Sequence, residues 1–178
     1  MRFFLAFAAA YLLVLPAPGR AQDRVPVVLT PDESVTLRFD HRDADPALVE
    51  RTPATWTPFE LAVARHLVAG IGVDSGSSAT LREHEDLPPL PAIAPGLVRL
   101  RIFQIAGRQT VLFIENGEDR ALVYRATMTR SGRDAPTDVC LVPAHNFANE
   151  HWPYPIDQLS LSDLRLVEWN GGDTVPCA

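Results

Sequence analysis

The sequence contains no lysine, and all 16 of its basic residues are arginine. Schiff-base catalysis, the phosphate-binding P-loop and Ser-Lys dyads each need a lysine, so these enzyme classes are excluded. The sequence also lacks the Gly-x-Ser-x-Gly motif that exposes a nucleophilic serine on a sharp turn. It therefore predicts a protein that is not an enzyme and that uses no cofactor.

Long hydrophobic runs are absent except at the start of the chain. Arg2 precedes an apolar run over Phe3–Leu15, and Gly19-Arg20-Ala21 then places small residues at the two positions that signal peptidase reads. The run covers about 20 Å as a helix, too short for a hydrocarbon core of about 30 Å. We predict that residues 1–21 are a cleavable secretory signal and that the mature protein is periplasmic or secreted, with no membrane span after cleavage.

Positive charge is scarce in the mature chain. Arg2 and Arg20 leave with the leader, so 14 arginines remain against 22 acidic residues, a net charge of −8 with histidines neutral. Nucleic acids and anionic membranes bind clustered positive charge. The sequence has no basic cluster, so no nucleic acid partner is predicted.

Only two cysteines are present, Cys140 and Cys177. An even pair in an exported chain predicts a disulfide, whereas a redox pair needs Cys-x-x-Cys spacing and a zinc site needs more ligands. The disulfide would close a loop of 38 residues and stabilise the fold by roughly 4 kcal/mol in the chain-entropy model.

The first half of the mature chain predicts two strands and one helix. Residues 27–29 form an expected edge strand, and alternation over 35–39 predicts a half-buried strand. Residues 40–55 are expected to be a polar loop. A capping box, Thr57 with Glu60, predicts a helix over 58–69 that ends at Gly70. Its apolar stripe holds Phe59, Ala62, Val63, His66 and Leu67, so His66 is expected in the core.

A proline-rich connection at 84–96 follows, with Pro88, Pro89, Pro91 and Pro95 in close succession. The part before it is too small to form a core alone. Residues 22–178 are therefore predicted to fold as a single β-rich domain.

Four strands are predicted in the second half, at 98–105, 110–115, 121–129 and 137–142. Short turns join them, which implies antiparallel neighbours. In the third strand, Leu122, Tyr124, Ala126 and Met128 share the core face. Leucines alternate over 159–166 and change phase at Ser162-Asp163, which predicts a β-bulge or a short turn within a last strand or strand pair.

These elements predict a mainly β fold, an antiparallel β-sandwich with one short α-helix. In architecture it resembles the immunoglobulin-like domains of envelope proteins. The alternative is a small closed β-barrel.

The segment 144–155 carries the best candidate binding residues, Phe147, Trp152 and Tyr154. Aromatic side chains on a loop held by a rigid scaffold are typical of interfaces and of sugar-stacking platforms. In the other interpretation, Trp152 and Tyr154 fold inward and close one end of the sandwich.

His145, Glu150 and His151 lie in the same segment and could bind a metal, because imidazole and carboxylate groups suit zinc or copper. Their spacing matches no metal motif, and sequence neighbours diverge on an extended backbone. No metal ligands are assigned.

The leading functional hypothesis is an exported, non-enzymatic module that offers the loop from Phe147 to Tyr154, or in addition a sheet edge, to an envelope protein partner. One alternative is a small-molecule or saccharide-binding protein that uses the same aromatic residues. Another is a metal-binding protein built on His145, Glu150 and His151.

Overall fold

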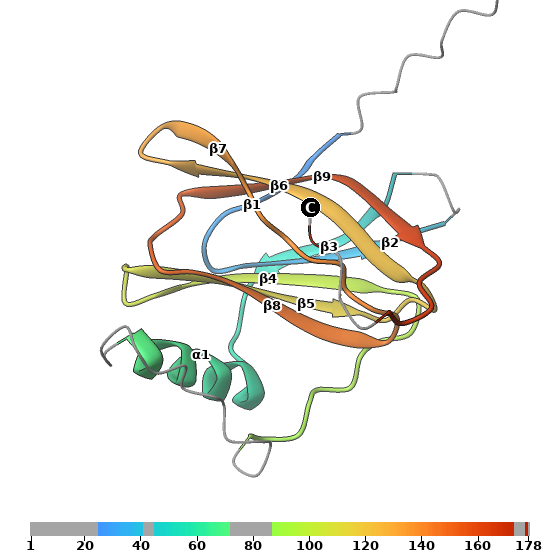
Figure 1. The fold of residues 1–178 in the computed structure, drawn as a ribbon, viewed down its shortest axis with the longest axis horizontal. Helices are drawn as coiled ribbons and strands as arrows, with labels where there is room; N and C mark the ends of the chain where they lie inside the picture. The colour runs from blue at the N-terminus through green and yellow to red at the C-terminus, as the bar shows by residue number, and fades with distance from the viewer. Residues whose placement is uncertain (1–24, 41–44, 72–86, 173–176, 178) are drawn as a thin grey trace, which may run out of the picture.

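A computed structural model describes residues 25–40, 45–71, 87–172 and 177 (Figure 1). The predicted signal peptide at 1–21 lies outside the described residues. Among the described residues, no helix is long and apolar enough to cross a bilayer.

Two antiparallel sheets pack face to face, which confirms the predicted sandwich and shows that the barrel alternative is wrong. The four-stranded sheet has the order β1-β9-β6-β7, and the five-stranded sheet has the order β3-β2-β4-β5-β8. In chain order the strands are β1 Val27–Leu29, β2 Glu33–Arg38, β3 Ala47–Pro53, β4 Val98–Ile105, β5 Gln109–Asn116, β6 Ala121–Arg130, β7 Arg133–Thr137, β8 Asn146–Trp152 and β9 Gln158–Val167.

The main core lies between the sheets and follows the period-two pattern. Leu122, Tyr124 and Ala126 of β6 are buried there and Met128 packs against them, as predicted. The expected bulge is present, because the pairing of β6 with β9 shifts register between Val123 and Arg125. The edge position of β1 is also confirmed.

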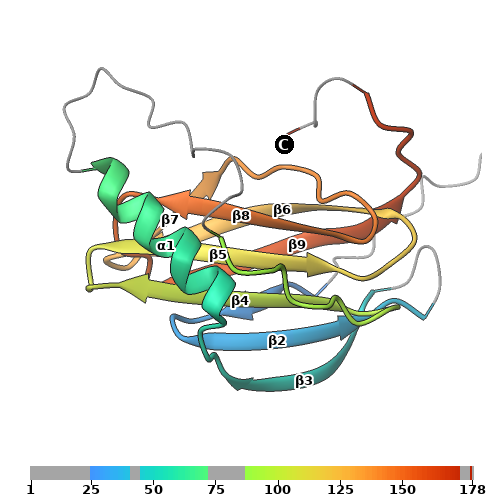
Figure 2. The ribbon, with the colours of Figure 1, turned by 90° about the horizontal axis from the view of Figure 1, so that it is seen from below.

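Helix α1, Pro58–Ile71, covers the outer face of the five-stranded sheet (Figure 2). Its capping box forms as predicted: the Thr57 amide donates to Glu60 Oε2 at 2.9 Å, and the Glu60 amide donates to Thr57 Oγ1 at 3.2 Å. The helix continues past Gly70, and His66 is exposed on its solvent side. The prediction of a core histidine was wrong because the helix buries Val63 and Ala64 and half-buries Leu67, whereas His66 lies outside this stripe.

A second apolar cluster fills the space between α1 and the sheet. β4 explains how both faces are covered: Leu100 and Ile102 enter the main core, whereas Phe103 points toward the helix. Trp56 stacks on Phe103 with ring centroids 3.8 Å apart. The five-stranded sheet is therefore the buried middle layer of the molecule.

Three expectations about strands and loops are corrected. The predicted polar loop at 40–55 contains strand β3. The predicted strand at 137–142 is wrong, because β7 ends at Thr137 and the following residues form only isolated bridges at Cys140 and Val142. The described part of the proline-rich connection, 87–97, contains no helix or strand.

The turn after β5 is a corner and not a hairpin, because β5 and β6 belong to different sheets. Buried Asn116 fixes this corner: its Nδ2 donates to the carbonyls of Arg120, Val142 and Pro143. Gly117 follows, and a Cβ there would lie 2.0 Å from the Ala94 carbonyl oxygen. The backbone crossing between sheets therefore requires glycine.

Cys140 and Cys177 form a disulfide, with sulfur atoms 2.10 Å apart. The bond ties the end of the chain to the segment between β7 and β8, as the cysteine count predicts.

Candidate functional site

The aromatic segment that the sequence places in a loop is mostly a strand. Asn146–Trp152 forms β8, which pairs with β5 at one edge of the five-stranded sheet. Alternate side chains of a strand point to opposite faces. The segment therefore cannot present its aromatic residues on one surface.

Phe147 lies on the outer face, toward the helix. Its ring meets Phe59 edge-on at 5.0 Å and lies 5.5 Å from Phe113. These contacts commit Phe147 to holding α1 on the sheet.

Trp152 lies on the inner face and is only 5% exposed. Its indole nitrogen donates to Thr137 Oγ1 at 2.7 Å, so the polar group of this buried side chain has a hydrogen-bond partner. Tyr154 is half-buried and lies under the guanidinium of Arg130, 3.8 Å from its ring centroid. The structure thus separates the three predicted binding residues into three environments.

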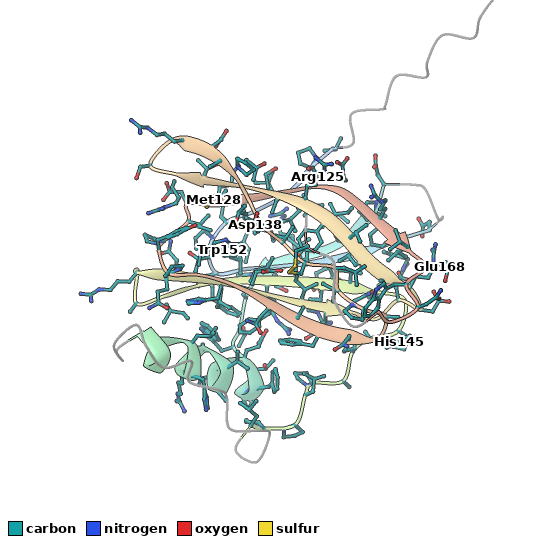
Figure 3. The ribbon with its side chains drawn as sticks, viewed as in Figure 1. Arg125, Met128, Asp138, His145, Trp152 and Glu168 are labelled. Atoms are coloured by element: carbon teal, nitrogen blue, oxygen red, sulfur yellow. A yellow bond between two sulfur atoms is a disulfide. The ribbon has the colours of Figure 1, made fainter. Side chains whose placement is uncertain are left out.

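The three candidate metal ligands are also separated. His145 and Trp152 lie near opposite ends of β8 (Figure 3). Glu150 faces inward and accepts the Cys140 amide at 2.9 Å, whereas His151 faces outward and lies 2.9 Å from Gln109 Oε1. Within the described part of the chain, no three His, Cys, Asp or Glu side chains are grouped as a metal site.

Burial changes the titration of this region. It raises the pKa of Glu150, although the Cys140 amide lowers it in part, and it lowers the pKa of His151. Burial, reinforced by the Glu150 carboxylate, also raises the pKa of Tyr124. The Tyr124 hydroxyl faces the Glu150 carboxylate, and this interaction also lowers the pKa of Glu150 in part, so two buried titratable groups share this corner of the core.

A buried charge cluster beneath α1 was missed by the sequence analysis. Arg101 donates through Nε to Glu60 Oε1 at 2.7 Å and through a terminal nitrogen to Glu115. Arg99 reaches the same Glu115 at 3.1 Å. Glu60 therefore both caps the helix and binds it to β4, a role that no local sequence signal reveals.

The most accessible backbone of the sandwich is at β3. Figure 2 shows this strand at the outer edge of the five-stranded sheet, and among the described strands it pairs only with β2. All seven of its residues are exposed. Leu48 and Val49 are 57% and 47% exposed and place large apolar side chains beside this free edge.

Contacts with the neighbouring strands hold β3 in place. Arg51 forms an ion pair with Glu33 at 2.8 Å and donates to the Val28 carbonyl at 2.9 Å, which links β3 to both sheets. A bulge opposite Thr36 and Leu37 bends the strand. Such a bend limits unspecific edge pairing while leaving the outward backbone groups open.

The other three sheet edges are less suited to pairing. β1 has only three residues. β7 has five, and its Pro136, which has no amide to donate, lies inside the strand, whereas Pro53 is the last residue of β3. β8 is as long as β3, but its large side chains, Phe147 and Trp152, pack into the two apolar clusters. The geometry therefore favours β3 as the candidate functional site.

No protein-family model matches the chain, and neither a curated protein nor a solved structure matches it.

Proposed function

We propose that this chain is an exported, non-enzymatic interaction module that binds an extended segment of an envelope protein at the free edge of β3. The fully exposed seven-residue edge strand, with its exposed Leu48 and Val49, carries the proposal. A partner strand added there gains main-chain hydrogen bonds, and alternate side chains give it specificity. The periplasmic or secreted location and the immunoglobulin-like type of the sandwich remain predictions.

This proposal places the binding surface at β3, whereas the leading sequence hypothesis placed it first at the 144–155 segment. The aromatic residues of β8 are used to join the helix and the second sheet to the central sheet. Leu48 and Val49 make no comparable contacts and lie outside both apolar clusters. An exposed apolar edge of this kind is a ready template for another strand.

Photocrosslinking in living cells tests the proposal. A benzoylphenylalanine placed at Val49 should capture a partner, whereas the same group at Leu90, an equally apolar exposed site at 45% exposure, should not. The double variant Leu48→Lys, Val49→Lys should abolish copurification of that partner, because charges on an edge strand oppose pairing.

The matched control for the lysine variant is Leu90→Lys, which should retain the partner. Thermal melting must show that both variants fold. Capture that is equal at Val49 and Leu90, copurification that survives the double substitution, or a crosslink only between two copies of this chain would each contradict the proposal.

A further inference from the structure

A groove lies between α1 and the hairpin that joins β4 to β5, separate from the edge of β3. It encloses about 490 Å³, and its lining residues are Trp56, Leu61, Ala64, Arg65, Gln104, Ile105 and Ala106. A volume of this size is typical of pockets for small molecules, which are mostly apolar with a few placed polar groups.

The groove has apolar walls and one charged side chain. Leu61 is 38% exposed, although it sits on a helix that buries other apolar residues nearby, and Trp56 and Ile105 are only partly covered. Arg65 is exposed, and it makes no ion pair with any described residue. Among the described residues that line the groove, none is acidic.

Phe103 and Ile105 face the helix, so the side chain of Gln104 between them points to the opposite face of β4, where its Nε2 donates to the Ile156 carbonyl at 3.2 Å. Among the described lining residues, Arg65 is therefore the one with a charged or polar side chain on the helix side. The turn beside Gln104 is strained, since Ala106 has φ +51°, a conformation that non-glycine residues avoid.

We propose that this groove binds a small amphipathic carboxylate, with its apolar body against Trp56, Leu61 and Ile105 and its anionic group at Arg65. The exposed guanidinium of Arg65, which forms no ion pair with a described residue, complements an anion, because arginine binds carboxylates through two parallel hydrogen bonds. The apolar walls gain free energy from each methylene group that leaves water. The charge and the apolar walls together select a molecule that has both features.

Decanoate, kept below its micelle concentration, is the probe for this site. Titration followed by amide NMR should show saturable shifts at Leu61, Ala64, Arg65, Ile105 and Ala106. Decyltrimethylammonium, which has the same chain and the opposite charge, should bind at least about tenfold more weakly, since it loses the Arg65 pair.

Substitutions separate the two parts of the site. Arg65→Gln should weaken decanoate binding by about fivefold, a modest factor because Arg65 is exposed. Leu61→Gln should weaken both probes. The matched controls Arg133→Gln and Leu90→Gln change exposed residues that do not line the groove and should leave binding unchanged.

Several results would overturn the proposal. One is the absence of saturable decanoate binding up to about 1 mM, a concentration that corresponds to a binding free energy of only about −4 kcal/mol. The others are equal affinity for the two probes and chemical shifts that map to another surface. A dimer that buries Leu61 without any ligand would show that a second copy occupies the groove. None of these results bears on β3, which does not line it.

Discussion

At the scale of single residues, the buried side chain of Arg101 connects helix α1 to the five-stranded sheet through ion pairs. It lies between the carboxylates of Glu60 and Glu115, both almost fully buried. Two carboxylates cannot remain charged in the interior without a cation between them, because the desolvation of each costs several kcal/mol.

Arg101→Met should therefore destabilise the fold by about 3–5 kcal/mol, the usual cost of removing one partner from a buried ion pair. Urea unfolding measures the loss. The matched control is Arg125→Met, which breaks an exposed ion pair with Asp163 and should cost less than about 1 kcal/mol. If both variants lost the same free energy of unfolding, the ion pairs of Arg101 would contribute no more than an exposed pair, which would contradict the prediction.

Ala106 stores backbone strain in the hairpin turn, because its φ of +51° brings Cβ close to the following carbonyl. Ala106→Gly should relieve about 1–2 kcal/mol of strain and lose about 0.4–1 kcal/mol to the greater freedom of the unfolded chain. A higher melting temperature is the expected result. Ala92→Gly, an exposed alanine without a positive φ, should lower it instead.

Glu150 should make stability depend on pH. Burial raises the pKa of Glu150 in the folded protein above its usual value of 4.5. The stability that protonated Glu150 contributes is therefore fully present below pH 4.5 and is lost as pH rises through the folded pKa. Glu150→Gln should therefore gain stability relative to the wild type between pH 4 and pH 7, as followed by urea unfolding at each pH.

Glu33→Gln is the control of opposite sign. Burial raises the pKa of Glu33, but hydrogen bonds from Thr30 and Arg51 outweigh it and the net pKa is lowered from 4.5. The wild type should thus have its advantage over Glu33→Gln at pH 7 and lose it as pH falls. A flat difference for Glu150→Gln would mean that this carboxylate is solvated.

At the scale of elements, local signals predict what local contacts build. The capping box predicts the start of α1 because both of its hydrogen bonds join residues three apart. β3 and β8 escape prediction because edge strands alternate weakly and depend on distant partners, Glu33–Arg38 for β3 and Gln109–Asn116 for β8. The candidate site was missed for the same reason: an exposed edge has no apolar pattern.

The disulfide links the segment between β7 and β8 to the residues that follow β9. The double variant Cys140→Ser, Cys177→Ser should lose about 4 kcal/mol if the bond acts by restricting the unfolded chain. Dithiothreitol should destabilise the wild type by a similar amount and leave the double variant unchanged. A loss below about 1 kcal/mol would show that the tail adds little to the fold.

At the scale of the whole molecule, the sandwich follows from the number of short strands, but the assignment of strands to sheets does not. In the sequence, the turn after Asn116 has the pattern of a hairpin. Only its tertiary contacts, such as those of Asn116 with Val142 and Pro143, show that the chain crosses to the other sheet there. The charge cluster of Arg101 is equally invisible, because Glu60 is 41 residues away in sequence.

The four edges of the two sheets differ in how accessible they are to a partner strand. Three of the sheet edges in the described part of the chain are short, interrupted by a proline or packed against the apolar clusters, whereas β3 is exposed from Ala47 to Thr52 and has its proline only at its last position. Strand addition would extend the five-stranded sheet without disturbing either apolar cluster.

Hydrogen exchange of the β3 amides, measured in the free protein and in complex with the captured partner, tests this account most directly. Strand addition predicts that exchange slows selectively within Ala47–Pro53, because outward amides gain hydrogen bonds. Exchange in β3 that stays the same while another surface becomes protected would contradict it.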